Sequence, residues 1–351
     1  MRMEETPARI KRSKWRLALT VVTFIALAVL IYGVRKDIGD VIENLGKVNT
    51  LALLLIIPIE ALNYDVYTRF YVRIFRILGK NVRYRDMYRL NLELNFVNHI
   101  LPSGGISGIS YFTVRMRNYG VSGPKSTLSQ LIKLLMLYIS YQPILILGVF
   151  LLAIRGHVNN LVMVVASSII TLLVVGTFGF IYMIESRSRI NTFLTAITRI
   201  LNKLLGLVRR KQETFSIEGA QNAFGELHDN YQLLKENWRQ LKVPFLYLMI
   251  ANATEVAAVY AVYIAFGRLV NVGAVILAYA VANFAGLVSV LPAGIGIYEG
   301  LMTAVLVATG IPAGLSIPVT IMYRVINMAI QLTPGYYFYQ KALRSGVTGE
   351  K

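Results

Sequence analysis

Long apolar segments recur through the 351-residue chain and restrict it to folds that sit in a lipid bilayer. A helix needs about 20 mostly apolar residues to cross the hydrocarbon core. Charged residues make up only 15% of the chain, against about 25% in soluble proteins. Seven segments have the required character, at residues 17–34, 51–72, 128–154, 161–184, 243–266, 272–290 and 315–338. The sequence therefore predicts an all-α, polytopic helical membrane protein with one transmembrane domain over residues 1–351.

The excess of basic residues predicts how the chain is oriented. The formal charge is +18, and the Lys and Arg residues gather beside apolar segments, as they do on the cytoplasmic side of membrane proteins. A basic stretch from Arg9 to Arg16 precedes the first segment, so we expect a cytoplasmic N-terminus and a multi-pass protein of the cell (inner, cytoplasmic) membrane. No nucleic-acid-binding signature is present, and nucleic acid is not an expected partner.

Two further apolar segments, at residues 87–112 and 291–310, are interrupted and complicate the count of crossings. Between six and nine crossings fit the sequence, and about eight are expected. Basic residues near both ends predict that both termini are cytoplasmic, which requires an even number. Either one interrupted segment crosses while the other re-enters, or the count of clear spans is wrong by one.

Residues 187–242 form a polar, basic insert between two spans. Apolar residues recur there at helical spacing, which predicts a cytoplasmic amphipathic helical hairpin lying on the membrane surface. A role in partner binding or gating is the alternative interpretation.

Both interruptions carry a Leu-Pro-small-Gly string, at residues 101–104 and 291–294. Proline removes a backbone donor and clashes with the preceding helical turn, so each helix should break there. Broken helices are tolerated in hydrocarbon only where protein or a water-filled cavity receives the freed backbone groups. Paired breaks in two halves of a chain are typical of transporters with an internal repeat. Two unrelated proline kinks are the alternative.

Polar residues that lipid would reject accompany these breaks. Glu299 follows the second break, and Arg324 lies in the last span, far enough along the chain to turn back and pair with it. Glu60 and Asp65 are candidates for buried partners of basic residues. Further polar residues inside apolar segments are Asn63, Glu93, Asn95, Asn98, His99, Asn252, Glu255, Asn327 and Gln331.

The run Pro-Ala-Gly-Ile-Gly-Ile-Tyr-Glu at 292–299, followed by Tyr323-Arg324, resembles the C-terminal signature of the lysylphosphatidylglycerol synthase transmembrane-region family. The first break with Arg115 is similar to the N-terminal Pro/Gly motif of that family. The resemblance implies a flippase-like membrane protein. Because the chain ends shortly after its last span, we expect the membrane part alone, without the aminoacyltransferase domain of the two-part enzymes.

The leading hypothesis is a lipid flippase that moves a lipid or lipid-linked headgroup between leaflets. The alternatives are a membrane transferase acting on a lipid-linked substrate and a non-catalytic partner of an envelope-lipid enzyme. Enzymatic activity is not expected under the leading hypothesis. No cofactor or metal ion is expected, since the chain has no Cys, three scattered His residues and no Walker motif. The predicted substrate-binding residues are Pro102, Gly104, Gly105, Arg115, Lys133, Pro292, Gly294, Gly296, Glu299, Tyr323 and Arg324.

Overall fold

The computed structural model describes residues 35–100, 106–154, 160–186, 228–288 and 294–344, together with Tyr32, Ser188 and Arg189. Within these ranges the regular elements are helices and none is a strand, which confirms the all-α prediction. The predicted first span at 17–34 lies outside the described residues. So do residues 190–227 of the predicted surface hairpin, and Pro102, Gly104, Gly105 and Pro292.

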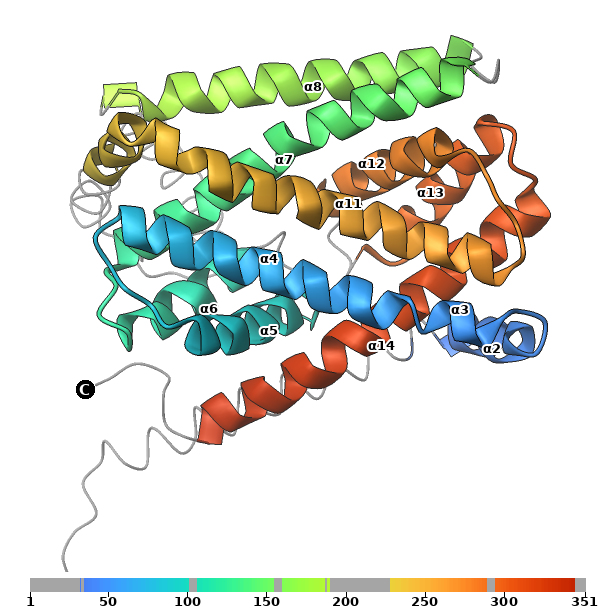
Figure 1. The fold of residues 1–351 in the computed structure, drawn as a ribbon, viewed down its shortest axis with the longest axis horizontal. Coiled ribbons are helices and arrows are strands. Elements are labelled where there is room, and N and C mark those ends of the chain that lie inside the picture. Colours follow the sequence, from blue (N-terminus) through green and yellow to red (C-terminus); the bar gives the residue numbers. More distant parts are fainter. Residues whose placement is uncertain are drawn as a thin grey trace, which may run out of the picture.

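The described helices fall into two groups (Figure 1). The first group is α2 (Arg35–Leu45), α3 (Thr50–Leu53), α4 (Ile56–Ile77), α5 (Tyr84–Ile100), α6 (Ile106–Arg117) and α7 (Gly123–Ile154). The second group is α8 (Asn160–Ile184), a short 3-10 turn η1 (Trp238–Leu241), α11 (Lys242–Ala265), α12 (Val272–Val288), α13 (Ile297–Ala308) and α14 (Ala313–Arg344).

Five described helical segments are long and apolar enough to cross a bilayer, and they show a multi-pass membrane protein. These segments are Thr50–Ile77, Gly123–Ile154, Val162–Gly179, Trp238–Ala265 and Ala313–Arg344. Large apolar side chains such as Phe150, Leu172 and Phe178 are exposed on α7 and α8. In lipid these side chains lose nothing by exposure, because the surrounding hydrocarbon is as apolar as they are.

Both predicted helix breaks are present. Helix α5 ends at Ile100 and α6 begins at Ile106, while α12 ends at Val288 and α13 begins at Ile297. Gly294 and Gly296 have φ angles of 67° and 85°. These left-handed conformations favour glycine, so both residues shape the turn into α13.

The two halves of the described fold repeat the same series of helices. Helices α4, α5, α6 and α7 contain 22, 17, 12 and 32 residues. Helices α11, α12, α13 and α14 contain 24, 17, 12 and 32 residues in the same order. Three of the four corresponding helices are equal in length and the fourth pair differs by two residues, which supports the predicted internal repeat over two unrelated kinks.

The two halves run in opposite directions. The Asn49 amide, just before α3, donates to the Ala265 carbonyl at the end of α11, and Asn63 within α4 contacts Ala251 within α11. Helices α4 and α11 are therefore antiparallel neighbours. Helices α7 and α14 also run oppositely across the molecule (Figure 1). The fold is an inverted repeat.

Each half contributes one hairpin of two short helices. Helices α5 and α6 enter from the side where α4 ends, which we call the basic face because Arg76, Lys80, Arg83 and Arg85 lie there. Helices α12 and α13 enter from the other side, the opposite face, where α11 ends and α14 begins (Figure 1).

This arrangement corrects the predicted span at 272–290, because its helix α12 is one arm of a hairpin instead of a crossing. The five long segments and the predicted span at 17–34 then give six crossings, an even number. Because the span at 17–34 lies outside the described residues, the number of crossings stays a prediction.

The hairpins are exchanged between the halves. Helix α5 of the first half packs on α14 of the second, and α12 of the second half packs on α7 of the first. Glycines permit both contacts: a Cβ on Gly335 of α14 would lie 2.8 Å from the Leu92 carbonyl oxygen of α5, and one on Gly273 of α12 would lie 2.1 Å from the Gly148 carbonyl oxygen of α7. Small residues at helix crossings are the usual means of tight packing in membranes.

The described end of the polar insert packs against the basic face. Residues 228–236 are helical, Leu234 is buried in the same apolar cluster as Phe75 and Leu248, and Lys235 forms an ion pair with Glu185. The insert as a separate surface hairpin stays a prediction.

We predict that Gly335→Ala destabilises the protein by about 1–3 kcal/mol, because the added methyl overpacks the α5–α14 contact. In an isolated helix the same change would stabilise by about 1 kcal/mol. Gly176→Ala in α8 is the matched control, since no atom lies within 4 Å of its added Cβ. Denaturant unfolding in mixed micelles measures both variants, and equal or greater stability of Gly335→Ala would contradict the exchanged packing.

Candidate functional site

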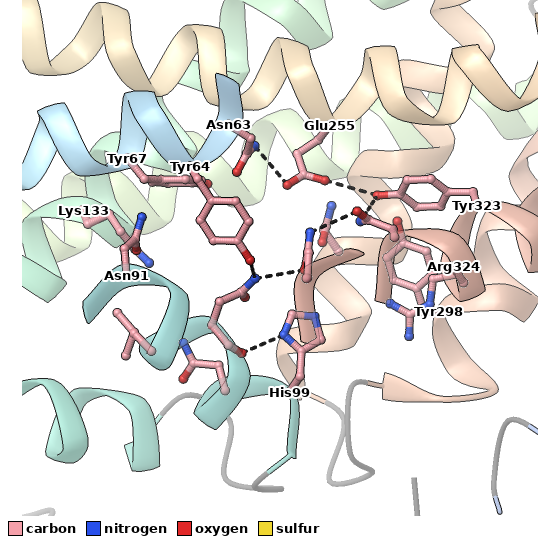
Figure 2. A pocket seen from close by; sticks show the side chains of 16 residues that line it. Asn63, Tyr64, Tyr67, Asn91, His99, Lys133, Glu255, Tyr298, Tyr323 and Arg324 are labelled. Carbon is pink, nitrogen blue, oxygen red and sulfur yellow. Dashed lines mark hydrogen bonds between the residues drawn. The ribbon is translucent and has the colours of Figure 1, made fainter. Parts of the chain in front are cut away.

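A polar cavity of about 200 Å³ lies between the two halves. Seven helices contribute to it, and a single lining residue, Leu94, is aliphatic. Figure 2 shows the lining side chains, which are Asn63, Tyr64, Tyr67, Asn91, Leu94, Asn95, Asn98, His99, Lys133, Glu255, Asn283, Tyr298, Tyr323, Arg324, Asn327 and Gln331. Amide, phenol and ionisable groups in such number are costly inside a membrane bundle and mark a functional site by default.

Lys133 of α7 is the first of two basic residues in this cavity. It lies beside Tyr67 and Asn91 (Figure 2), with its Nζ 5.5 Å from the centre of the Tyr67 ring. Within the described residues it forms no ion pair or hydrogen bond. A lysine that lines a cavity without forming an ion pair presents its charge to whatever occupies the cavity.

Arg324 of α14 is the second basic residue, and it lies beside Tyr298 and Tyr323 (Figure 2). Its Nε donates to Oε1 of Glu299 at 2.8 Å, and its guanidinium lies 4.2 Å from the centre of the Tyr298 ring. The Glu299–Arg324 pair proposed from the sequence is therefore confirmed. Counted from Gly123 and Ala313, Lys133 and Arg324 take the eleventh and twelfth positions of the two 32-residue helices, so the repeat brings a cation to the cavity from each half.

Glu299 has a second role at the start of α13. Its Oε2 accepts a hydrogen bond of 2.6 Å from the Gly296 amide, one of the amides that a helix N-terminus leaves unpaired. A carboxylate in the first turn also interacts favourably with the helix dipole. One side chain thus stabilises the inner end of the hairpin and fixes the position of Arg324.

A hydrogen-bond network joins the two halves across the cavity. The Asn95 amide of α5 donates to the Tyr64 hydroxyl of α4 and, at 3.0 Å, to Oε1 of Gln331 of α14. The Nδ1 atom of His99 lies 2.9 Å from the Asn95 carbonyl oxygen. The bond to Gln331 joins α5 of the first half to α14 of the second, whereas the Tyr64 bond joins α5 to α4 and the His99 contact lies within α5.

Arg115 lies away from the cavity lining. It forms a bidentate pair with Glu93, with Nε–Oε2 at 2.8 Å and Nη2–Oε1 at 3.0 Å, and Tyr111 donates to the same carboxylate. Both charged side chains are over nine-tenths buried. The pair connects α5 to α6 and closes the first hairpin, as Glu299 and Arg324 connect α13 to α14.

The acidic residues of α4 differ from each other. Asp65 pairs with Arg69 at 2.7 Å, but this pair is partly exposed and is not the buried pair considered from the sequence. Glu60 is buried, at 1% exposure, and accepts a hydrogen bond from Gln331. In the described part of the chain no ion pair of Glu60 with a basic residue is present, so its pairing stays a prediction.

On the opposite face, α2 adds an acidic group near the Glu299–Arg324 pair. Partial burial raises the pKa of Asp37 above its usual range, and the neighbouring carboxylates of Glu299 and Asp40 raise it further, while Arg324 opposes them. Helix α2 packs on α14, so Asp37 lies at the outer end of the helix that carries Arg324.

Of the residues predicted from the sequence, Lys133, Tyr323 and Arg324 line the cavity together. Glu299 does not line the cavity but pairs with Arg324, and Gly296 donates to Glu299. Gly294 lies in the turn before α13. Arg115 pairs with Glu93 in the first hairpin. Sequence reasoning missed lining residues whose polar character is ordinary in a single helix, namely Tyr64, Tyr67, Asn91 and Asn283. Their shared signal is the recurrence of Asn and Tyr at helical spacing within apolar segments.

No cluster of three or more His, Asp or Glu side chains suited to a metal ion occurs among the residues that the structure describes.

Comparison with known proteins places this chain among membrane proteins. The family model for the lysylphosphatidylglycerol synthase TM region matches residues 15–335. A UPF0104 membrane protein of Methanocaldococcus jannaschii is 21% identical over 93% of this chain and 95% of its own length. A UPF0104 membrane protein of Methanothermobacter thermautotrophicus is 20% identical over 88% of this chain and 90% of its own length. One of Pyrococcus horikoshii is 24% identical over 52% of this chain, a match that spans 54% of that protein.

We predict that Arg115→Met destabilises the protein by about 3–5 kcal/mol, because it leaves the buried Glu93 carboxylate without its cation. The double variant Glu93→Gln/Arg115→Met should recover most of that loss. Arg83→Met is the control, since Arg83 pairs with Asp86 while 86% exposed, and such surface pairs contribute at most about 1 kcal/mol. Equal destabilisation by Arg115→Met and Arg83→Met would contradict a structural role for the buried pair.

Proposed function

Because this chain belongs to the lysylphosphatidylglycerol synthase transmembrane-region family, we propose that it moves a lipid with a phosphate-bearing headgroup between the two leaflets of its membrane. The acyl chains remain in the hydrocarbon while the headgroup passes through the polar cavity. The family match also supports lipid translocation over a soluble or purely structural role.

One observation carries the proposal: the cavity holds a lysine that forms no ion pair with an acidic residue among the described residues. Lys133 is partly buried, and a cation taken out of water is costly unless something neutralises it. Lys133 has the amides of Asn91 and the ring of Tyr67 beside it, which solvate a headgroup but carry no negative charge. An anionic phosphate supplies that charge, and charge-assisted hydrogen bonds to phosphate are among the strong ones in proteins.

The inverted hairpins provide a route for the headgroup. One hairpin enters from each face, and Lys133 and Arg324 lie on opposite sides of the cavity between them. A phosphate entering near one cation therefore meets the second before it leaves. Asn and Tyr side chains replace the water that a headgroup gives up on the way, which lowers the cost of crossing hydrocarbon.

The charge distribution supports an orientation. Arg76 lies in the last turn of α4, and Lys80, Arg83 and Arg85 come after that helix. Lys341 and Arg344 lie in the last turn of α14, also on the basic face. By the positive-inside rule this face is cytoplasmic. The α12–α13 hairpin then opens to the outside. Localisation to the cell membrane stays a prediction, as do the two alternatives of a transferase activity and a partnership with an envelope enzyme.

We predict that Lys133→Met slows translocation of a labelled anionic phospholipid in proteoliposomes by about ten- to a hundredfold. A charge-assisted hydrogen bond contributes about 1.5–3 kcal/mol, and each 1.4 kcal/mol is a factor of ten. Methionine has a similar length and leaves no partner unpaired, so the fold is retained. Lys47→Met removes the same charge from an exposed position between α2 and α3 and should leave the rate unchanged.

A zwitterionic and an uncharged lipid, assayed alongside, separate headgroup recognition from general leakage. The proposal is wrong if Lys133→Met translocates the anionic lipid as fast as the unchanged protein, or if all three lipids cross at one rate.

A further inference from the structure

Two further carboxylates, Glu60 of α4 and Glu255 of α11, lie on neighbouring helices where the two halves meet, and their charges interact. Asn63, one turn after Glu60, donates to Oε1 of Glu255 at 3.2 Å. Glu60 accepts from Gln331 through Oε2 at 3.0 Å, while its Oε1 is buried with no hydrogen-bond partner. Figure 2 shows Glu255 between Asn63 and Tyr323 in the upper part of the cavity.

Neither carboxylate has a cation to neutralise it in the described part of the chain. The groups facing the pair are mainly phenols, which stay neutral. They come from five helices: Tyr64 and Tyr67 of α4, Tyr141 of α7, Tyr279 of α12, Tyr298 of α13 and Tyr323 of α14, with Lys133 of α7 beyond Tyr67. Arg324, the other cation of the cavity, is paired with Glu299.

Glu60 is buried and Glu255 is partly buried. Two such carboxylates close together do not both ionise, because each charge raises the cost of the other and the loss of water adds to that cost. Such pairs share one proton, as buried carboxylate dyads do. We expect the proton on Oε1 of Glu60, the oxygen that accepts no hydrogen bond. Once protonated, that oxygen becomes a hydrogen-bond donor.

We propose that Glu60 and Glu255 form a proton-binding site that couples headgroup movement to proton movement across the membrane. The inference rests on the proposed translocation function and adds its energy source. A proton enters from one aqueous side, resides on the pair and leaves to the other side, and no other reactant is consumed.

A chain of side chains on α14 links this site to the headgroup cavity. Gln331 donates both to Glu60 and, at 3.1 Å, to Oδ1 of Asn327. The Asn327 amide donates to the Tyr323 hydroxyl at 3.2 Å, and that hydroxyl donates to Oε2 of Glu255 at 3.1 Å. Both carboxylates therefore bond to α14, one at each end of a continuous chain.

The consequence is mechanical. Removing the proton leaves two like charges, whose repulsion is relieved when α4 and α11 separate or when Gln331 and Tyr323 reorient. Either change moves the segment of α14 that carries Arg324, the neighbour of Tyr323. Protonation of the pair thus shifts the equilibrium between two conformations of the cavity. Coupling of proton movement to headgroup movement requires such a shift.

The test compares translocation by the full-length protein with and without an imposed one-unit pH difference across proteoliposomes. A tenfold difference in proton concentration should change the initial rate by up to about tenfold when one proton moves per lipid. Glu60→Gln and Glu255→Gln mimic the protonated form and keep an acceptor for their partners, so they should fold and lose the response, giving a ratio near one. Glu43→Gln changes an exposed carboxylate of α2 and should keep it.

A second readout is independent of lipid movement. The infrared carbonyl band of a buried protonated carboxyl should be present in the purified protein, absent in Glu60→Gln, and retained in Glu43→Gln. If the protein translocates lipid with no response to the pH difference, or responds to a sodium difference instead, the proton site is wrong and the translocation proposal stands. If no lipid moves, the translocation proposal fails, and the infrared band alone decides whether the pair binds a proton.

Discussion

A helix that stops inside hydrocarbon leaves backbone amides and carbonyls unpaired, and the whole fold is arranged around four such helix ends. Helices α5, α6, α12 and α13 all end or begin near the middle of the bundle. Because lipid cannot satisfy their ends, other protein must enclose them. The long helices do so: α5 packs on α14 and α12 on α7 of the opposite half, while α6 packs on α7 and α13 on α14 of their own half. Helices α5, α12 and α13 also line the polar cavity.

The charges of the buried interior divide into two kinds. Glu93 with Arg115, and Glu299 with Arg324, form ion pairs that connect the arms of a hairpin or a hairpin to its long helix. Lys133, Glu60 and Glu255 have no such partner in the described residues. Breaking a pair of the first kind costs stability, whereas the second kind is costly in the resting protein and calls for a ligand or a proton. This division links the fold to the proposed lipid translocation.

Much of this followed from the sequence because it depends on local chemistry. Proline and glycine predicted both helix breaks, and the distance along the chain between Glu299 and Arg324 allowed their pairing. Other features depend on which helices are neighbours, and no single segment reveals that. Arg115 resembled a headgroup ligand until Glu93 was found beside it, and residues 272–290 resembled a span because a hairpin arm inside the bundle is as apolar as a crossing. Tyr67 and Asn283 became site residues only through the inverted packing.

The account depends most directly on the two hairpins entering from opposite faces. The chain contains no cysteine, so single cysteines can be placed at the ends of each hairpin and labelled with a membrane-impermeant thiol reagent from either side. Asn81→Cys and Arg117→Cys mark the ends of the first hairpin, and Arg268→Cys and Pro312→Cys those of the second. The account predicts that the first two label from one side only and the last two from the other side only. Labelling of the two ends of either hairpin from different sides would show that the hairpin crosses the membrane and would contradict it.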